Sequence, residues 1–235
     1  MVCILQKEKT ERFINKPKLY ISITLVNLKM IPLLLRLKKL QHKDIARAQD
    51  IIIEELYKII DNAVLHGGTA IWRCYQGNRF SEDIDMYLPD NEKINIFFEN
   101  LEKRGFIIEK KKITENSLYS NLKFERVYVR FEALFKKVKS VLRDYETIDG
   151  NFITVSTLTP EELIKEKINA YLNRNKIRDL YDIFFLLRYV QKIAELKKII
   201  EEFKNPIDEK ELKILIFEGL VPDSKKMLEY IKYKV

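Results

Sequence analysis

The sequence has few of the residues that build disulfide frameworks or zinc sites. Its 235 residues include two cysteines, Cys3 and Cys74, and two histidines, His42 and His66. Two cysteines provide neither a disulfide framework nor a cysteine-based zinc set, and two histidines argue against a histidine-based metal site. A chain of this length can instead bury a sizeable hydrophobic core.

Long hydrophobic runs are also lacking. No apolar stretch reaches the roughly 20 residues that a membrane-spanning helix needs, and the richest window, MIPLLLRLKKL, is interrupted by Arg36, Lys38 and Lys39. Charged residues between positions 7 and 12 stand where a signal peptide would be apolar. We therefore expect a soluble, globular protein in the cytoplasm, with no membrane partner.

Basic residues are concentrated in the middle of the chain. Residues 103–143 hold twelve Lys or Arg and four Asp or Glu, an excess of eight that equals the net charge of +8 for the whole chain. This segment could be a solvated face that keeps the protein soluble. It could equally be a surface that binds a polyanion, and the sequence leaves both interpretations open.

The hydrophobic pattern divides the chain into three parts. Residues 1–29 show no clear period, and we expect them to add little to the core and to belong to an overlong start. Residues 30–158 mix helical and strand patterns, whereas residues 159–235 show helical patterns only. The predicted fold class is therefore α+β, with an α/β domain followed by a helical C-terminal domain.

Within the α/β part, apolar residues at steps of three and four predict helices, and alternating or β-branched runs predict strands. The predicted helices are 42–63, 69–76 and 90–105, and the predicted strands are 64–66, 83–88, 106–113, 124–135 and 151–158. The helical part opens on TPEE, where Thr159 is a cap, Pro160 is in the first turn and Glu162 completes a capping box. Its predicted helices are about 160–173, 177–203, 208–219 and 223–233.

The most informative stretch places two of the six glycines shortly before an acidic cluster. Asp83 and Asp85 are two apart on a predicted strand, so both carboxylates point to one face. A divalent cation would relieve their repulsion, and Mg²⁺ prefers oxygen ligands that it shares with phosphates. A turn at Gly67 and Gly68 would let phosphates approach a helix N-terminus, which Thr69 would cap while it adds a hydroxyl. Taken singly, such a pair is most often an exposed strand end, and two glycines are most often only a turn.

In this order and spacing, GGTA and RFSEDID resemble the nucleotidyltransferase motif of the DNA polymerase β superfamily. They are most similar to the AbiEii/AbiGii toxin branch, which includes the MenT-type toxins. The resemblance covers roughly residues 30–190. It implies a polymerase-β-type core, which is a mixed sheet with flanking helices, and adds Arg79 and Ser81 to the nucleotide-binding residues Gly67, Gly68 and Thr69.

The resemblance also implies a third carboxylate on a neighbouring strand, within a pattern like K-x-D. Here the chain reads Arg130–Phe131–Glu132, which makes Glu132 the predicted third metal ligand beside Asp83 and Asp85. Glutamate in place of aspartate lengthens the arm by one methylene. The alternatives are Glu125 as the ligand, or Glu132 as an exposed glutamate without a role.

In the helical part, residues 161–186 are similar to the K-x-x-A-x-x-x-R and R-D-x-Y-D signature of the same branch. The resemblance implies catalytic roles for Lys167 and Asp179, and nucleotide binding by Lys167, Arg178 and Asp182. The spacing places Lys167 and Arg174 on one helix face, and we expect Lys167 to be an exposed lysine in a cleft between sheet and helices. The alternative is a set of ordinary helix salt bridges among Arg178, Asp179 and Asp182.

Together these features predict an enzyme that transfers a nucleoside monophosphate from an NTP to an acceptor, with Mg²⁺, or alternatively Mn²⁺, as cofactor. The resemblance implies a toxin of a toxin–antitoxin or phage-defence system, a tRNA-like RNA acceptor and a cognate antitoxin as partner. Two other functions stay open. The chain could be a regulatory module that binds a nucleotide without transferring it, or a nucleic-acid-binding protein whose acidic pair is structural.

Overall fold

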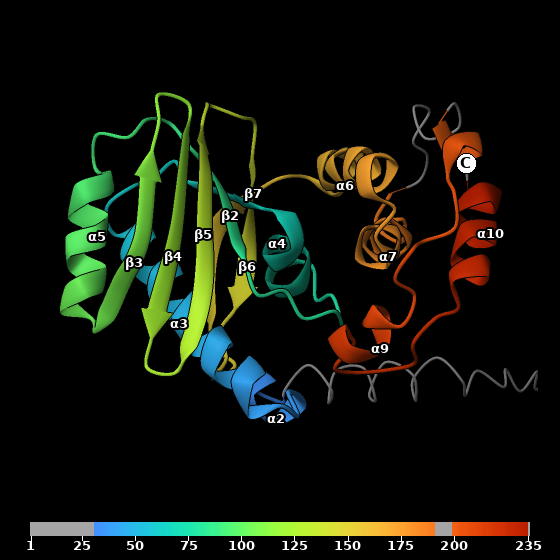
Figure 1. The fold of residues 1–235 in the computed structure, drawn as a ribbon, viewed down its shortest axis with the longest axis horizontal. Helices are drawn as coiled ribbons and strands as arrows, with labels where there is room; N and C mark the ends of the chain where they lie inside the picture. Colours follow the sequence, from blue (N-terminus) through green and yellow to red (C-terminus); the bar gives the residue numbers. More distant parts are fainter. Residues whose placement is uncertain (1–30, 191–198, 235) are drawn as a thin grey trace, which may run out of the picture. The chain divides into compact units, whose positions relative to one another are not determined.

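A computed structural model describes residues 31–190 and 199–234 (Figure 1). Residues from Pro32 onward form one compact unit. The predicted N-terminal extension, residues 1–29, lies outside the described residues. The domain boundaries proposed from the sequence stay a prediction.

The described part of the chain contains a mixed sheet of seven strands in the order β3-β4-β5-β2-β1-β7-β6. The strands are β1 (Val64–His66), β2 (Ile84–Leu88), β3 (Phe106–Ile113), β4 (Ser117–Phe124), β5 (Val127–Phe135), β6 (Val141–Glu146) and β7 (Phe152–Thr157). The pairs β2–β5 and β1–β7 are parallel, and the other neighbours are antiparallel. The mixed sheet with flanking and C-terminal helices confirms the predicted fold class.

Two strands were not predicted. The sequence indicated one strand over residues 124–135, but β4 ends at Phe124 and β5 begins at Val127, because Glu125 turns the chain with a φ of 51°. The run that forms β4 carries Ser and Asn at half-buried positions, so it lacks the β-branched signal of a strand. β6 is an edge strand whose central residues are exposed, which hides its period.

Two helices cover one face of the sheet and leave the other open near β5. The helices of this part are α2 (Leu33–Arg36), α3 (Leu40–Tyr57), α4 (Gly67–Cys74) and α5 (Ile94–Lys103). Both α3 and α5 pack on the sheet (Figure 1). The ring of Phe97 on α5 lies 5.1 Å from that of Phe131 on β5. Along β5, burial alternates, with Phe131 buried and its neighbour Arg130 exposed, as expected for a strand with one covered face.

The C-terminal part is helical, and its first helix begins as predicted. Its elements are α6 (Pro160–Arg174), α7 (Ile177–Leu186), the short 3₁₀ helix η1 (Ile200–Glu202), α9 (Glu211–Leu215) and α10 (Ser224–Lys234). The Thr159 hydroxyl accepts a hydrogen bond from the Glu162 backbone N–H at 3.3 Å, and the Glu162 carboxylate accepts one from the Thr159 N–H at 3.2 Å. This reciprocal capping box, with Pro160 next to it, confirms the predicted helix start.

Two of the predicted helices are too long. The helix predicted over 177–203 ends at Leu186, and of its remainder residues 191–198 lie outside the described residues. The helix predicted over 208–219 shortens to α9, because the chain after Leu215 is extended and pairs with the loop before β2. Ile216 bridges Arg79, and the Phe217 N–H donates to the Asn78 carbonyl at 3.1 Å. Here tertiary pairing overrides helix propensity.

No helix within residues 31–190 and 199–234 is both long and apolar enough to cross a membrane.

Candidate active site

The two glycines allow the chain to pack closely where β1 ends and α4 begins. Gly67 is the first residue of α4 and has a φ of +70°, and a Cβ on it would collide with the Asp85 carboxylate. A Cβ on Gly68 would lie 2.5 Å from the Ser81 hydroxyl oxygen and 2.6 Å from the Arg79 guanidinium. The glycines are therefore needed for the approach of Asp85, Ser81 and Arg79 to the N-terminus of α4.

Thr69 does not cap α4. The N-terminal capping position is His66, and no side chain caps the helix there. Thr69 is fully buried, and its hydroxyl donates to the backbone carbonyl of Asp83. The predicted cap is wrong, and the hydroxyl instead fixes the chain where it enters β2.

A second side chain that supports this loop was not predicted from the sequence. The fully buried Gln49 on α3 donates through its amide to the carbonyl of Ser81 at 2.9 Å and to that of Glu82 at 3.1 Å. A glutamine at a core-facing position of an amphipathic helix was the available signal, because a buried amide must find partners.

The acidic residues converge on the open face of the sheet. Asp85 on β2 is in register with Glu132 on β5 and with His66 on β1, and Glu132 is in register with Tyr119 on β4. Cross-strand neighbours in register point to the same face. Glu125 lies in the turn that joins β4 to β5, so the structure brings Glu132, and not Glu125, beside Asp85.

Arg130 lies between two of these carboxylates. Its guanidinium forms an ion pair with the Asp83 carboxylate, and its Nε is 3.1 Å from a carboxylate oxygen of Glu132. The sequence comparison had placed Arg130 in the K-x-D-like pattern without assigning it a role. In the structure it supplies positive charge at the point where the carboxylates would otherwise repel each other.

The electrostatics of the carboxylates follow from burial and crowding. Burial raises the pKa of Asp85 and the nearby Asp83 adds to the effect, while His66 and Lys167 oppose it. Burial also raises the pKa of Glu132, and Arg130 opposes that shift. Both shifts show that the carboxylates lie where an additional positive charge would be stabilising.

The second wall of the site is a buried ion-pair network. The Lys167 ammonium on α6 lies 2.8 Å from a carboxylate oxygen of Asp182 and 3.6 Å from one of Asp179. Arg79 binds Asp182 through two hydrogen bonds of 2.7 and 2.8 Å, and Arg174 binds Asp179 in the same way with the same lengths. Both aspartates are fully buried, and Lys167 is 8% exposed.

This network corrects two expectations. Lys167 is not an exposed lysine, because it is buried against the two aspartates. The ion pairs are also not local salt bridges of one helix, since they join α6, α7 and the loop that carries Arg79. Although burial opposes ionisation of Asp182, Arg79 and Lys167 hold its pKa below its usual value. Asp179 and Asp182 therefore stand behind the site and orient the cations in front of them.

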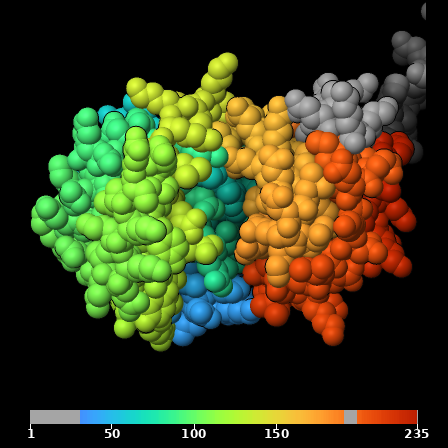
Figure 2. Space-filling view, turned by 45° about the horizontal axis from the view of Figure 1, so that its top comes forward, coloured from blue at the N-terminus to red at the C-terminus, as the bar shows by residue number. Residues whose placement is uncertain are grey.

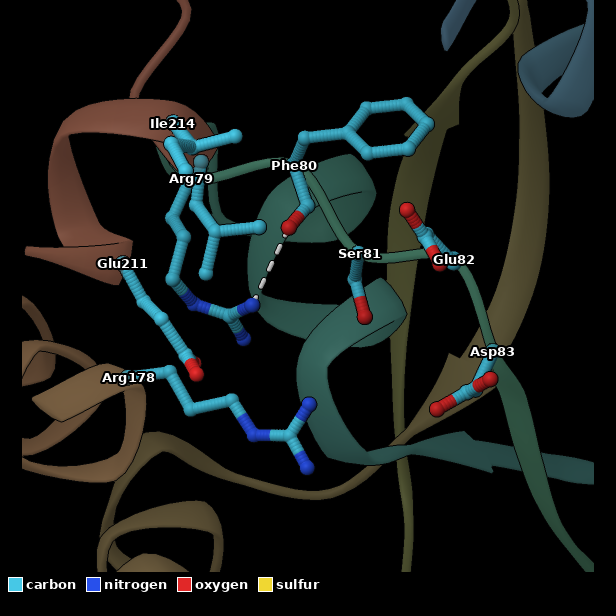
Figure 3. A pocket seen from close by; sticks show the side chains of 9 residues that line it. Arg79, Phe80, Ser81, Glu82, Asp83, Arg178, Glu211 and Ile214 are labelled. Atoms are coloured by element: carbon cyan, nitrogen blue, oxygen red, sulfur yellow. Dashed lines mark hydrogen bonds between the residues drawn. The ribbon is translucent and has the colours of Figure 1, made fainter. Parts of the chain in front are cut away.

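A cavity of about 160 Å³ brings the acidic and basic walls together. It is lined by Gly68, Arg79, Ser81, Asp83, Asp85, Arg130, Glu132, Lys167, Arg174 and Arg178. The half-buried Arg178 points into the space in front of Ser81 and Asp83 (Figure 3). Within residues 31–190 and 199–234 its side chain forms no ion pair or hydrogen bond. We refer to this space as the central cavity.

A second cavity, of about 180 Å³, adjoins the central cavity, and Figure 3 shows the side chains that line it. The two share Arg79, Ser81, Asp83 and Arg178. The second one adds Phe80, Glu82, Glu211, Ile214 and Leu215, so α9 forms one of its walls. We refer to this second cavity as the α9 cavity. In a space-filling view, residues from the region of α4 and β2 lie in a hollow between the sheet and the C-terminal helices (Figure 2).

A third cavity, of about 240 Å³, lies along the sheet beside Asp85 and Glu132. The remaining residues of its lining are His66, Met86, Ser117, Leu118, Tyr119, Ala133 and Leu134. Asp85 and Glu132 line both this cavity and the central one, so the carboxylates separate the two spaces. We refer to this space as the β4 cavity.

His66 in the β4 cavity is held by two residues that the sequence did not single out. Its Nδ1 lies 3.1 Å from the Glu166 carboxylate, and its ring stacks on Tyr87 at 3.9 Å. The Tyr87 hydroxyl donates to the same carboxylate. The only indication in the sequence was that both residues stand next to predicted site residues: His66 directly precedes Gly67, and Glu166 directly precedes Lys167.

No group of three His, Cys, Asp or Glu side chains in the described part of the chain is arranged to hold one metal ion. The three-carboxylate metal site predicted from the sequence is therefore not preformed. Asp83, Asp85 and Glu132 do line one cavity, but Arg130 forms ion pairs with Asp83 and Glu132.

The fold is that of a nucleotidyltransferase. It is similar to the structure of MenT4, a nucleotidyltransferase toxin from Mycobacterium tuberculosis, with a TM-score of 0.58, 17% identity, and 81% of each chain covered. It is also similar to JHP933 from Helicobacter pylori, with a TM-score of 0.60, 18% identity, and coverage of 83% of this chain and 90% of that one. A comparison with curated protein sequences gives no match.

The family is shown by the sequence itself. The profile described as nucleotidyl transferase AbiEii toxin, type IV toxin–antitoxin system, matches residues 56–223. The chain therefore belongs to the AbiEii family of nucleotidyltransferase toxins, which implies an NTP as substrate. The match continues past residue 190, where the sequence resemblance had been expected to end, and so includes α9.

Proposed function

We propose that this enzyme transfers a nucleoside monophosphate from an NTP to an RNA acceptor in a reaction that depends on Mg²⁺. The observation that carries the proposal is the central cavity. There, Asp83, Asp85 and Glu132 face the N-terminus of α4 and the guanidinium of Arg178, which is unpaired among the described residues. This arrangement combines carboxylates for a cation with positive charges for a polyphosphate.

The triphosphate is the part of the substrate that the basic wall would bind. Gly68 leaves the N-terminus of α4 accessible from the cavity, and backbone N–H groups at a helix N-terminus bind phosphate oxygens. Lys167 supplies a compact charge and Arg178 a planar pair of donors. Because Asp179 and Asp182 hold Lys167, Arg174 and Arg79 in place, these cations need little reordering when the substrate binds.

The nucleoside would occupy the α9 cavity. It adjoins the central cavity through four shared residues, and Ile214 and Leu215 give it an apolar wall. A ligand with a charged end and a flat, largely apolar end fits a pair of cavities that differ in the same way.

The donor chemistry fits Mg²⁺ even though the described residues contain no three-ligand cage. Mg²⁺ is usually bound by one or two carboxylates together with waters and substrate phosphates. Asp83 and Asp85 would hold it, with Glu132 next to them, and Mn²⁺ accepts the same oxygen ligands. When bound, the ion neutralises charge that develops on the phosphate oxygens.

The chemical step follows from this placement. The acceptor hydroxyl oxygen bonds to the α-phosphorus while the bond from that phosphorus to the bridging α–β oxygen breaks, so pyrophosphate leaves on the side of the basic wall. Glu132, at the border of the β4 cavity, would accept the hydroxyl proton. Arg178 and Lys167 would stabilise the charge on the departing pyrophosphate.

RNA as the acceptor is supported by the charge of the surface beside the carboxylates. Residues 103–143, which carry the whole excess of positive charge, include β3, β4 and β5. We also propose a cognate antitoxin as a further partner, because the family is one of toxin–antitoxin systems.

Incubation with total RNA, Mg²⁺ and each α-labelled NTP in turn tests the proposal. The expected result is label on RNA with the wild type and none with Asp83→Asn or Asp85→Asn, both of which should stay folded. NTP binding without any transfer would instead indicate a regulatory nucleotide-binding module. RNA binding that is unchanged by Asp83→Ala and by removal of Mg²⁺, again without transfer, would indicate a nucleic-acid-binding protein with a structural acidic pair.

A further inference from the structure

The open face of β3, β4 and β5 combines basic and aromatic side chains. On β5 the buried residues Val129 and Phe131 alternate with exposed Tyr128 and Arg130, so the exposed set points away from the helix-covered face. Asn121 and Lys123 on β4 are in register with Arg130 and Tyr128, and Tyr119 is in register with Glu132, the next residue on this side of β5. On β3, Ile107, Lys110 and Lys112 are in register with these β4 residues. The basic, amide and aromatic members form what we call the basic–aromatic face: Lys110, Lys112, Tyr119, Asn121, Lys123, Tyr128 and Arg130.

The basic–aromatic face leads directly to the candidate active site. Lys112 on β3 is in register with Tyr119 on β4, Tyr119 with Glu132 on β5, and Glu132 with Asp85 on β2. At about 4.8 Å between neighbouring strands, Lys112 lies roughly 14 Å from Asp85 along this row. Tyr119 also lines the β4 cavity, so the face ends at the side of the carboxylates opposite the proposed triphosphate site.

Each of the two tyrosines carries a lysine close to its ring. The Lys110 ammonium lies 5.0 Å from the Tyr119 ring centre, and the Lys123 ammonium lies 5.8 Å from that of Tyr128. An aromatic ring beside a cation matches the repeating unit of a single-stranded nucleic acid, which is a base beside a phosphate. Tyr128 is 47% exposed, which leaves its ring available for stacking.

Three acids approach this surface. Asp83 and Glu132 form ion pairs with Arg130 and belong to the candidate active site, and Glu109 accepts a hydrogen bond of 3.4 Å from Asn121 at the edge of the face. Across the rest of the face the charges are positive, in keeping with a partner that carries many negative charges.

We infer that the basic–aromatic face binds the single-stranded end of an RNA and delivers its terminal hydroxyl into the β4 cavity beside Glu132. This inference rests on the proposed transfer to RNA and specifies where the acceptor lies. A sheet with projecting rings reaches unstacked bases, whereas a duplex keeps its bases stacked and offers mainly its shape and backbone. The surface therefore selects single-stranded ends over blunt duplexes.

The sequence offers a matched control for the charges. Lys111 lies between Lys110 and Lys112 on β3 but faces the opposite side of the sheet, where its ammonium is 4.8 Å from the ring of Phe98 on α5. The test pair is Lys110→Gln/Lys112→Gln against Lys103→Gln/Lys111→Gln, which remove the same charge from the two faces. Binding of a labelled single-stranded RNA oligonucleotide is measured without NTP or Mg²⁺ over a range of salt concentrations.

The expected result is a lower affinity for Lys110→Gln/Lys112→Gln only. The slope of log affinity against log salt should flatten by about 0.7 for each lysine that contacts a phosphate. Tyr119→Leu/Tyr128→Leu should lower the affinity by at least about fivefold while the salt slope is unchanged, because stacking does not depend on counterion release. Circular dichroism and NTP affinity confirm that each variant is folded.

Several results would overturn the inference. Equal losses in the two lysine pairs would mean that only net charge matters. Unchanged binding in the tyrosine variant would remove the stacking role, and equal binding of a blunt duplex, or equal competition by polyglutamate, would remove the selectivity for single strands.

The outcome is separable from that of the proposed function. If the face variants lose RNA binding but the wild type transfers no nucleotide to any RNA, the face stands and the proposed function fails. If both face variants transfer nucleotides to RNA at the wild-type rate, the function stands and the face fails.

Discussion

At the level of single residues, the buried ion pairs determine the role of each charged side chain around the central cavity. Arg79 and Asp182 are 103 residues apart in sequence and form a fully buried pair. The family resemblance implied that Lys167 binds the nucleotide, and in the structure Lys167 lines the central cavity. Its burial could not be predicted from the sequence, because it depends on Asp182 approaching from α7.

Replacing Asp182 with asparagine should therefore destabilise the fold. The change leaves Arg79 and Lys167 buried with less compensation, and breaking a buried pair in this way costs about 3–5 kcal/mol. Asp149→Asn, at an exposed position, is the control and should leave the melting temperature unchanged. Thermal melting at neutral pH provides the comparison, and equal melting temperatures for the two variants would contradict the buried-pair account.

The same variant should change the dependence of stability on pH. Since the pKa of Asp182 in the folded protein lies below the usual 3.8, its carboxylate stabilises the fold above pH 3.8. That stabilisation is lost as the pH falls below 3.8 through the lowered value. The difference in melting temperature between wild type and Asp182→Asn should thus be largest near neutral pH and shrink below pH 3.8.

Arg178 is the residue that best separates substrate binding from stability. Its side chain has no ion pair or hydrogen bond to lose within the described ranges, so Arg178→Gln should leave the melting temperature unchanged. It should weaken NTP binding about tenfold or more, as expected for the loss of a charged hydrogen bond to phosphate. Lys167→Gln should lower both NTP affinity and melting temperature. Calorimetric titration of both variants with NTP checks this, and unchanged affinity for Arg178→Gln would place the triphosphate elsewhere.

At the scale of helices and strands, the sequence predicted elements where local pattern and tertiary packing agree. Strands with β-branched and aromatic runs, such as residues 106–113, and the helix with a capping box at Thr159 are where they were expected. The strand β4 was missed because it contains no β-branched residue and because Ser120 stands at a buried position, where the apolar alternation is interrupted. The short α9 was overestimated because residues 216–217 pair with the loop before β2, and no local pattern reports such a contact.

Because α9 lines the α9 cavity, its proposed role in nucleoside binding can be tested. Ile214 is 59% exposed and lines the α9 cavity, so Ile214→Ala should remove apolar contact with the nucleoside at little cost in stability. We expect NTP affinity to fall about fivefold, from roughly 1 kcal/mol of lost apolar burial, while affinity for inorganic triphosphate stays the same. Ile207→Ala, which is 71% exposed and outside the cavity, serves as the control. An equal loss for both ligands would show that α9 does not bind the nucleoside.

At the level of the whole molecule, Asp85 and Glu132 lie between the central cavity and the β4 cavity. Among the described residues, no three side chains are arranged to hold a metal ion. A metal that depends on substrate phosphates for ligands should bind together with the nucleotide. Mn²⁺ titration followed by electron paramagnetic resonance should therefore show weak binding to the protein alone. Mn²⁺ should bind the complex of the protein with a non-hydrolysable NTP analogue at least about tenfold more tightly than it binds the analogue alone. Tight binding to the free protein would contradict this view.

In the proposed reaction, the central cavity holds an NTP whose α-phosphate is transferred to RNA. The most direct measurement follows the fate of the two ends of the triphosphate, with NTP labelled either at the α- or at the γ-phosphate. We expect the α-label to become covalently attached to RNA while the γ-label appears only in pyrophosphate, and Asp85→Asn to abolish both. Transfer of the γ-label to RNA or to protein, or the release of both labels without attachment, would contradict it.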